Sequence, residues 1–333
     1  MTPNTSHYKM LQDEIFNIQK PSDFERITFE VFKFQYENIE VYRQFCDLLN
    51  TTPSEIKKIE DIPFLPIEFF KSREIIVTDQ TPETIFTSSG TTGQITSKHL
   101  VANLEVYEKS FHKAFREQYG NPSEYAFLAL LPSYLEREGS SLIYMVEHLI
   151  KASKNPHSGF YLNEIDDLIN KLEFLENSNQ KTILIGVSYA LLDLIELKKF
   201  KLKNTVVMET GGMKGRRKEM IKEELHGVLK EGFGVEKIHS EYGMTELLSQ
   251  AYSTGNGIFK TPAWMKILTR DTEDAQTYIQ GKTGGINVVD LANIYSCAFI
   301  ATQDLGRVYE DGTFEILGRF DNSDIRGCNL MVL

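Results

Sequence analysis

Short apolar segments alternate with longer amphipathic ones from residue 83 to about residue 245, and this alternation constrains the fold more than any other feature. The strand candidates are ETIFT (83–87), YAFLALL (125–131), KTILIG (181–186), TVVMET (205–210) and KIHSEYG (237–243). The segments between and after them predict helices at 101–118, 139–153, 164–177, 187–199 and 215–230. We therefore predict an α/β fold, a largely parallel sheet covered by helices, with ligands at the carboxyl ends of the strands.

The segments on either side of this core have different patterns. Residues 1–60 predict helices, because Pro21 precedes an apolar stripe at helical spacing, and DIPFLPIEFFKS indicates an extended connector. After residue 260 the short strands WMKILT, GGINVVD, SCAFIAT and TFEILG are separated by turns, as in an antiparallel β unit. We predict a helical segment with its connector over 1–82, an α/β core over 83–259, and a small β subdomain with the tail over 260–333.

Composition excludes several classes of protein. The net charge of −11 and the lack of a basic block argue against a nucleic-acid partner. No apolar run reaches the ~18 residues of a membrane span, and the N-terminus lacks the basic-then-apolar order of a secretory signal. Cys46, Cys297 and Cys328 lie far apart, which argues against a disulfide framework or a zinc site and favours a reducing cytoplasm. We expect Cys46 and Cys297 to be packed core thiols.

A loop rich in hydroxyls and glycine follows the first strand candidate, and Lys98 comes shortly after it. The loop consists of Thr87, Ser88, Ser89, Gly90, Thr91, Thr92 and Gly93. Such a turn lets the backbone approach a polyphosphate and offers N–H and hydroxyl donors to it. Its spacing differs from G-x-x-x-x-G-K-[ST], because the last glycine does not precede the lysine. Taken alone, a flexible surface loop explains the pattern equally well.

Two further motifs end strand candidates with residues suited to a nucleotide. ETGGMKGRRKE (209–219) carries Gly211 and Gly212, which let the chain pass close to a flat ligand, before a cationic run that is as readily a solvated helix face. HSEYGMTELLSQ (239–250) predicts a strand, a turn and a helix. In it Tyr242 offers a flat face for a base, Thr245 a hydroxyl and Glu246 a hard oxygen ligand for Mg²⁺. An ordinary turn is the alternative.

Near the C-terminus, QDLGRV (303–308) and LGRFDNSDIRGC (317–328) each place an acid and an arginine beside a glycine turn. Asp304 could accept hydrogen bonds from both hydroxyls of a ribose, and Arg319 could reach the same sugar. Ordinary turn chemistry is the alternative for either residue.

Serines follow two of the strand candidates. Ser140 and Ser141 in LPSYLEREGSSLIYM (131–145) could bind an anion at a helix N-terminus or cap the helix, which is the commoner role. GVSYA (186–190), around Ser188, partly matches the nucleophile motif G-x-S-x-G, but Ala190 departs from it and no histidine follows His239. The sequence therefore argues against a serine hydrolase, and Ser188 is more simply a helix cap.

Taken in order, TSSGTTG, ETGG, EYGMTE, QDLG and GRFD resemble the core motifs of the adenylate-forming superfamily of acyl-CoA synthetases, luciferases and peptide-synthetase adenylation domains. The chain is most similar to the acyl-protein synthetase family, which includes the synthetase subunit of the bacterial bioluminescence fatty-acid reductase. LLPSYLEREGSSLIYM, the helical N-terminus with DIPFLPIEFFKS, and SDIRGC carry that closer likeness. The resemblance covers nearly the whole chain. It implies the N-terminal domain of an adenylate-forming enzyme without the C-terminal lid domain.

The resemblance implies that ATP activates a carboxylic acid, such as a long-chain fatty acid, to acyl-AMP with loss of pyrophosphate. The phosphate loop falls on residues 87–93, with Lys98 as its basic follow-up and Glu246 as the Mg²⁺-site glutamate. The implied nucleotide-binding residues elsewhere are Gly211, Gly212, Tyr242 (adenine stacking), Gly243, Thr245, Asp304 (ribose) and Arg319 (hinge side). A metal and fixed N–H donors suit this chemistry, because a carboxylate attacks an anionic phosphate.

One departure concerns the lid domain of the wider superfamily, whose catalytic lysine we expect to be absent here. Lys98 or Lys214 could neutralise charge instead. The acyl-protein synthetase family carries its acyl group on a cysteine near the C-terminus, and Cys328 occupies that place. Arg326 would favour the thiolate, whereas Asp321 and Asp324 would oppose it. The resemblance thus implies transfer of the acyl group to Cys328 as a thioester, and on to a partner acyl reductase.

Three other outcomes stay open from the sequence. Coenzyme A could accept the acyl group, as in acyl- and aryl-CoA ligases, or an amine or hydroxyl acceptor could take it. The non-enzymatic alternative is a degenerate nucleotide-binding module. The aromatic and aliphatic residues available for a pocket suit fatty, aryl and short branched acids alike.

Overall fold

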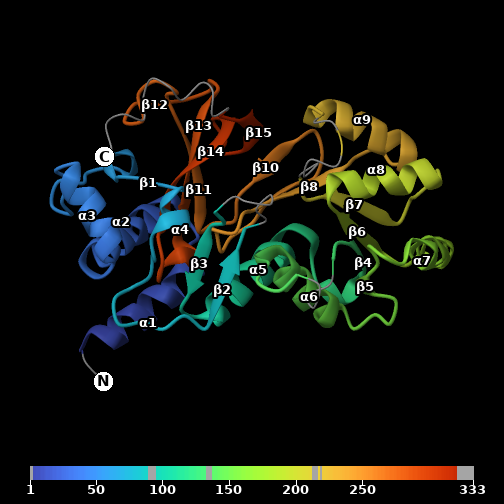
Figure 1. The fold of residues 1–333 in the computed structure, drawn as a ribbon, viewed down its shortest axis with the longest axis horizontal. Coiled ribbons are helices and arrows are strands. Elements are labelled where there is room, and N and C mark those ends of the chain that lie inside the picture. The colour runs from blue at the N-terminus through green and yellow to red at the C-terminus, as the bar shows by residue number, and fades with distance from the viewer. Residues whose placement is uncertain (1–2, 89–94, 133–136, 212–216, 218–219, 321–333) are drawn as a thin grey trace. The chain divides into compact units, whose positions relative to one another are not determined.

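The computed structural model (Figure 1) describes residues 3–88, 95–132, 137–211, 217 and 220–320, with the side chains of residues 3–8 left aside. The chain forms two compact units. The first unit consists of Met1–Ser110, Thr245–Ser249 and Thr261–Leu333, and the second consists of Phe111–Met244 and Gln250–Lys260. The three-part division at residues 82 and 259 stays a prediction.

The second unit is built on the parallel strands that the alternating pattern predicts. In sheet order these are β5 (Gly159–Phe160), β4 (Ala126–Leu130), β6 (Thr182–Gly186), β7 (Thr205–Glu209) and β8 (His239–Tyr242). Two antiparallel strands, β9 (Ala251–Ser253) and β10 (Ile258–Lys260), continue the sheet beyond β8. β4 and β6 are buried along their whole length, as expected of strands that helices cover on both faces.

Helices connect these strands and cover both faces of the sheet. They are α5 (Leu104–Tyr119), which begins in the first unit, α6 (Ser141–Ser153), α7 (Ile165–Asn177), α8 (Ser188–Leu197) and α9 (Lys222–Phe233), with the short 3-10 helix η2 (Pro122–Glu124). Figure 1 shows α6 on one face of the parallel strands and α7, α8 and α9 on the other. This arrangement follows from right-handed crossovers. The chain moves in one direction across the sheet from β4 to β5 and in the opposite direction from β5 through β6 and β7 to β8, so α6 lies on the opposite face from α7, α8 and α9.

Two elements of the predicted core are wrong in detail. The strand at ETIFT, β2 (Thr84–Thr87), does not join the parallel sheet but pairs antiparallel with β3 (Lys98–Val101). The connection over residues 88–97 is too short for a parallel crossover, which needs about a dozen residues. The helix predicted at 215–230 begins only at Lys222, where Glu223 and Glu224 supply the negative charge that favours a helix N-terminus.

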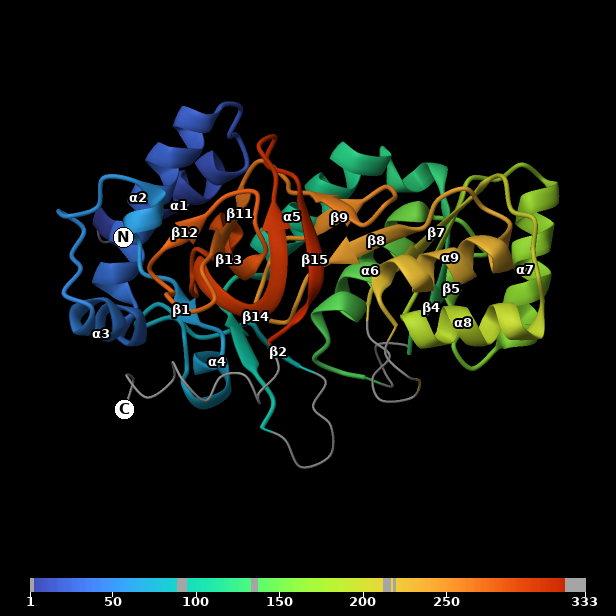
Figure 2. The ribbon, with the colours of Figure 1, turned by 90° about the horizontal axis from the view of Figure 1, so that it is seen from above.

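The first unit combines N-terminal helices with an antiparallel sheet, as predicted. The helices are α1 (Pro3–Ile15), α2 (Pro21–Asn38), α3 (Glu40–Leu48) and α4 (Phe69–Ser72), with the 3-10 helices η1 (Ile59–Asp61) and η3 (Leu291–Asn293). The sheet order is β12 (Tyr278–Ile279), β11 (Met265–Arg270), β13 (Gly284–Asp290), β14 (Phe299–Val308) and β15 (Phe314–Arg319). Figure 2 shows the long ribbons of β14 and β15 side by side. β1 (Leu65–Pro66), from the predicted connector, pairs parallel with β14.

Aromatic packing and one buried amide hold the N-terminal helices against this sheet. Phe32 on α2 meets Phe299 on β14 edge to face at 5.9 Å, and Tyr42 on α3 stacks on the same ring at 6.0 Å. The fully buried Gln35 donates to the carbonyl of Asn293 at 2.8 Å and accepts from the N–H of Ala298 at 3.0 Å. The polar side chain of a core helix is therefore satisfied by the turn between β13 and β14.

In the part of the chain that the structure describes, no helix combines the length and the apolar character needed to cross a membrane.

We expect Leu128→Ala to lower the free energy of unfolding by roughly 2–5 kcal/mol, because Leu128 is fully buried in β4 and truncation leaves a cavity. Urea unfolding followed by circular dichroism measures the change. Leu197→Ala is the matched control, since Leu197 ends α8 with 69% of its surface exposed. Equal losses in the two variants would contradict the assignment of β4 to the core.

Candidate functional site

The structure describes only part of the predicted site. Thr87, Ser88, Lys98, Thr245, Glu246, Asp304 and Arg319 lie in described parts of the first unit, and Gly211, Tyr242 and Gly243 lie in described parts of the second. The other predicted residues, Ser89, Gly90, Thr91, Thr92, Gly93, Gly212, Lys214 and Cys328, lie outside the described residues. Their roles stay predictions.

Two serines close the base of the predicted phosphate loop. In the β2–β3 hairpin Thr87 lies opposite Lys98. One residue beyond this pair, the N–H of Ser88 donates to the carbonyl of Ser97 at 3.1 Å, and the N–H of Ser97 donates to the Ser88 hydroxyl at 2.9 Å. The backbone N–H of Ser88 and one lone pair of its hydroxyl are therefore both used in hydrogen bonds that close the loop.

The segment Thr245–Ser249, which begins with the last two residues of EYGMTE, is held by a buried carboxylate. Asp290, at the end of β13, accepts from the N–H groups of Leu248 at 2.8 Å and Ser249 at 3.0 Å and from the Ser249 hydroxyl at 2.5 Å. The helix predicted after this turn is wrong. The backbone N–H groups that would continue a helix bond to Asp290 instead.

Two more side chains fix the start of the same segment. The ring Nδ1 of His99 lies 2.8 Å from the carbonyl oxygen of Thr245, and Asn293 donates its amide to the carbonyl of Glu246 at 2.7 Å. His99 is fully buried, which lowers its pKa to about 4, so the ring is neutral at pH 7 and donates from Nδ1. The backbone of Glu246 is thus fixed on both sides.

The Glu246 side chain is buried and lies among positive groups. Burial raises the pKa of the carboxyl, while a hydrogen bond with Ser97 and the charges of Arg319 and Lys71 act in the opposite direction. Among the described residues no group of three or more His, Cys, Asp or Glu side chains could hold a metal ion. One carboxylate nevertheless suits Mg²⁺, which binds proteins through one or two carboxylates and takes its other ligands from phosphates and water.

Asp304 and Arg319 meet across the β14–β15 pair. They are direct partners in the register, and Arg319 Nε donates to Asp304 Oδ1 at 3.0 Å. The Asp304 side chain is 7% exposed and that of Arg319 is 76% exposed. A bulge falls between Leu305 and Gly306, where a Cβ on Gly306 would lie 2.3 Å from a backbone oxygen. The glycine of the QDLG motif therefore permits the local strand geometry that presents Asp304.

A cation that the sequence analysis missed supports the same strands. Arg270, on β11, donates to the carbonyls of Ile286 at 2.7 Å and Thr302 at 2.6 Å. Burial lowers the pKa of this guanidinium, and Tyr278, Glu68 and Asp304 act in the opposite direction. Arg270 thus places a positive charge near the predicted ribose carboxylate, and nothing in the local sequence distinguishes it from a surface arginine.

In the second unit, the glycines of the predicted motifs stand at constrained positions. Gly211 has φ of +73°, a conformation that other residues rarely adopt. A Cβ on Gly243 would lie 2.5 Å from a carboxyl oxygen of Glu241. Tyr242, at 8% exposure, meets the ring of Phe259 at 5.9 Å with an interplanar angle of 61°. Stacking of Tyr242 on adenine stays a prediction.

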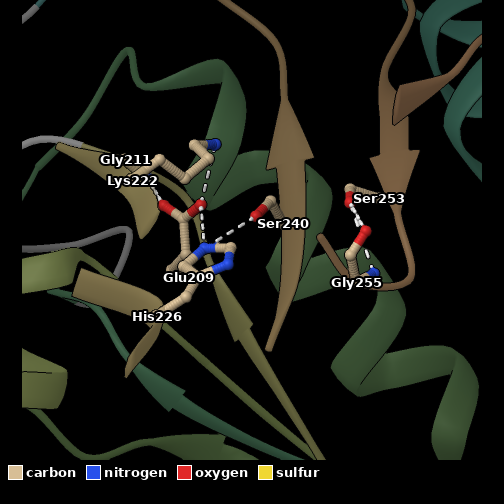
Figure 3. Close-up of polar contacts among 7 residues, drawn as sticks. All are labelled: Glu209, Gly211, Lys222, His226, Ser240, Ser253 and Gly255. Carbon is tan, nitrogen blue, oxygen red and sulfur yellow. Dashed lines mark hydrogen bonds and ion pairs between the residues drawn. The ribbon is translucent and has the colours of Figure 1, made fainter. Parts of the chain in front are cut away.

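Buried charges converge where ETGG leaves β7 (Figure 3). Glu209 accepts from the N–H of Gly211 at 2.7 Å and from Lys222 Nζ at 3.0 Å, and His226 Nε2 lies 3.4 Å from the same carboxylate. Burial raises the pKa of Glu209, but His226, Lys222 and Ser240 outweigh it and hold the pKa at about 2. The turn at Gly211 is therefore anchored to an ionised carboxylate.

Ser240, His226 and Glu209 do not form a catalytic triad. The Ser240 hydroxyl and the Glu209 carboxylate both face the same ring nitrogen of His226, each at 3.4 Å. A triad needs the serine and the carboxylate on opposite ring nitrogens. Ser240 is also fully buried.

The structure also shows the surroundings of the two serines that follow strand candidates, Ser140 and Ser188, and of the two cysteines expected in the core. Ser140 caps α6 by accepting from the N–H of Ile143, as the commoner alternative predicts. Ser188 is not a cap, since Val187 is the N-cap residue of α8 and the buried Ser188 hydroxyl has no hydrogen-bond partner. Cys46 and Cys297 are fully buried, as expected.

Arg217, which belongs to the cationic run of ETGGMKGRRKE, lies outside α9 and pairs with Asp193 and Glu196 on α8. The alternative of a solvated helix face is therefore wrong for this residue, which forms a surface ion pair.

Comparison with known proteins places this geometry in a family. The model of the acyl-protein synthetase family LuxE matches residues 14–119 and 143–333. A protein of Aliivibrio fischeri named long-chain-fatty-acid–luciferin-component ligase is 22% identical over 96% of this chain and 92% of its own length. A protein of Vibrio harveyi with the same name is 23% identical over 92% of this chain and 86% of its own.

Solved structures share the fold at low sequence identity. A 2-hydroxyisobutyryl-CoA ligase in an open conformation, with 2-HIB-AMP and CoA, superposes with a TM-score of 0.66 at 12% identity, over 92% of this chain and 72% of that one. The ATP-bound MatB of Rhodopseudomonas palustris gives a TM-score of 0.52 at 18% identity, over 71% of this chain and 47% of that one. The predicted α/β fold of adenylate-forming enzymes is confirmed.

We expect Glu209→Gln to flatten the pH dependence of stability. A folded-state pKa near 2, below the ordinary 4.5, stabilises the fold above pH ~5, and this contribution disappears as the pH falls towards 2. The free energy of unfolding of the wild type, relative to that of the variant, should thus fall by about 3 kcal/mol between pH 6 and pH 2. Urea unfolding at several pH values measures this. Glu231→Gln, an exposed site on α9, should behave as the wild type, and equal slopes for Glu209→Gln and wild type would contradict the assignment.

Proposed function

The chain belongs to the acyl-protein synthetase family LuxE and is a ligase of the acid–thiol class, and we propose that it uses ATP to activate a long-chain fatty acid as acyl-AMP. The name shared by the two bacterial relatives supports a long-chain fatty acid as the substrate. The structural observation that carries the proposal is the placement of Glu246. Its backbone is fixed on one side by His99 of β3, which bonds to the carbonyl of Thr245, and on the other side by Asn293, which bonds to its own carbonyl.

The proposed first step is displacement at the α-phosphorus of ATP. A carboxylate oxygen of the fatty acid attacks that phosphorus, the bond to the bridging oxygen of the β-phosphate breaks, and pyrophosphate leaves with the electron pair. Both reactants are anions, so the step needs fixed N–H donors and positive charge around the phosphates. The proposed donors are residues 87–93, with Lys98 as the nearby cation. Bound Mg²⁺ would neutralise phosphate charge, held by Glu246 and the phosphates.

The proposed sites for the nucleoside follow from the remaining motifs. Asp304 accepts hydrogen bonds from the ribose hydroxyls, and its ion pair with Arg319 orients the carboxylate. Tyr242 stacks on adenine and Thr245 offers a hydroxyl, while Gly211, Gly212 and Gly243 allow the backbone to pass close to the nucleotide. The φ of +73° at Gly211 supports a backbone turn that a side chain would strain.

The proposed second step moves the acyl group to Cys328. Its thiolate attacks the acyl carbonyl, the bond to the AMP phosphate oxygen breaks, AMP leaves, and a thioester remains. A partner acyl reductase then takes the acyl group. Cys46 and Cys297 are poor candidates for this role, because both are fully buried and burial raises the pKa of each, that of Cys46 to about 12. A free reactive thiol fits a reducing cytoplasm, where we place the enzyme.

We expect intact-mass spectrometry to detect an acyl adduct after incubation with ATP, Mg²⁺ and a panel of fatty, aryl and branched acids. The adduct should be released by hydroxylamine and absent from Cys328→Ala. Cys46→Ala, which removes a buried thiol, is the matched control and should still be acylated.

Two results would count against parts of this scheme. Formation of AMP and pyrophosphate without an adduct would keep the activation step and replace Cys328 by coenzyme A or another diffusible acceptor. A complete lack of AMP and adduct across the panel would favour a nucleotide-binding module without this activity.

We expect Asp304→Asn to raise KM for ATP in ATP–pyrophosphate exchange by roughly tenfold to a hundredfold. The reason is the loss of hydrogen bonds to a charged acceptor, in a side chain that is 7% exposed. Asp311→Asn, in the exposed turn between β14 and β15, removes the same charge from the same hairpin and should leave KM unchanged. Similar KM values for the two variants would remove Asp304 from the nucleotide site.

A further inference from the structure

Lys222 is a cation at the first residue of α9, a position that does not favour positive charge. The positive end of a helix dipole lies at the N-terminus, so a lysine there weakens the helix rather than stabilising it. The Lys222 side chain is nevertheless held in place, because its Nζ lies 3.0 Å from Oε1 of Glu209, whose side chain is 2% exposed. The charge of Lys222 therefore serves contacts outside α9.

One of these contacts leads to the Gly211 turn (Figure 3). Glu209 accepts from Lys222 on Oε1 and from the N–H of Gly211 on Oε2, the latter at 2.7 Å. His226 also faces Oε1, at the longer distance of 3.4 Å. The Glu209 carboxylate is ionised, so both donors make charge-assisted hydrogen bonds to it. Lys222 is thus joined to the Gly211 turn through a single buried carboxylate.

A second contact leads to the hairpin formed by β9 and β10. Nζ of Lys222 lies 4.6 Å from the centroid of the Phe259 ring, within the range of a cation–π interaction. The aliphatic part of Lys222 passes beside Gly257, where φ is +68° and a Cβ would lie 3.3 Å from Lys222 Cδ. A glycine at this turn therefore leaves room for the lysine.

Phe259 in turn packs against Tyr242. Phe259 is 1% exposed, and its ring meets that of Tyr242 edge to face at 5.9 Å between centroids. The contacts of Lys222 therefore run in two directions, through Glu209 to the Gly211 turn and through Phe259 to the Tyr242 ring. All of these residues belong to the second unit.

We propose that Lys222 is a positioning residue that couples the Gly211 turn to the Tyr242 ring. Its ammonium group fixes the carboxylate that anchors the turn and, at the same time, the aromatic ring on which Tyr242 packs. Lys222 acts through these neighbours and makes no contact with the phosphates of ATP. This inference rests on the proposed nucleotide-binding roles of Gly211 and Tyr242.

ATP–pyrophosphate exchange by the full chain, with the most active acid of the panel, tests this role, because ATP carries adenine and pyrophosphate does not. Lys222→Met keeps an apolar stem without the charge. We expect it to raise KM for ATP by about tenfold, the factor for one desolvated contact of a cation, and to leave KM for pyrophosphate unchanged. Lys222→Arg keeps a cation that binds carboxylates and stacks on aromatic rings, so it should restore most of the affinity for ATP.

Lys237→Met is the matched control. Lys237 is an exposed lysine of the same unit, and its Cδ would lie 3.2 Å from a Cβ on Gly255, in the same hairpin turn. This variant removes the same charge and should leave both KM values unchanged.

A second variant tests the other contact of Lys222. Phe259→Leu removes the ring but keeps the ion pair with Glu209, so it should also raise KM for ATP, and it provides the test if Lys222→Met does not fold. In the double variant KM for ATP should rise by less than the product of the two single effects, because both changes remove the same contact.

An unchanged KM for ATP in Lys222→Met overturns the proposal. An equal rise in KM for ATP and for pyrophosphate also overturns it, because Lys222 would then contact the phosphates directly. The same holds if Lys222→Arg is as impaired as Lys222→Met, or if the two single effects multiply in the double variant. A wild-type chain that shows no exchange with any acid would instead overturn the proposed function, so the two failures are distinguishable.

Discussion

The first unit depends on one buried carboxylate, that of Asp290. It accepts two backbone N–H groups and a hydroxyl from Leu248 and Ser249, and the N–H of Ala292 besides. A buried carboxylate without such donors would carry a large desolvation cost. Here the carboxylate is hydrogen-bonded, and each buried N–H or O–H group that donates to it also gains the partner it needs. The interaction therefore ties an irregular segment to the end of β13. The placement of Glu246 follows from it, because Glu246 lies two residues before the first bonded N–H.

Periodicity alone predicted most of the architecture. The buried strands β4 and β6 and the antiparallel strands after residue 260 lie where their apolar patterns place them. The errors arose where a local pattern cannot show which partner a strand takes. β2 reads like any strand of the parallel sheet, but the length of the loop that follows it restricts it to a hairpin. The expected helix after Tyr242 failed because a side chain distant in sequence, Asp290, takes its N–H groups.

The sequence indicated candidate site residues whose side-chain type suits the expected chemistry. It did not indicate residues whose only role is to hold another residue in place. Asp304 and Arg319 belong to separate motifs, and the structure brings them together at 3.0 Å. Ser97, His99, Asn293 and Arg270 were missed, because a serine, a histidine or an amide that positions another residue has no distinctive spacing. Their contacts join positions far apart in the chain, such as Asn293 with Glu246. Only a three-dimensional structure shows such pairs.

The packing around Trp264 makes tryptophan fluorescence sensitive to one region of the molecule. This is the single tryptophan of the chain, it is fully buried, and its indole N–H lies 2.9 Å from the hydroxyl of Ser249 and 3.0 Å from that of Ser110. Ser249 also bonds to Asp290, so the indole shares a hydrogen-bond network with the segment that carries Glu246. Indole emission responds to hydrogen bonding and polarity at its N–H. The tryptophan emission of the unlabelled protein therefore originates from one indole, whose environment is coupled to that segment.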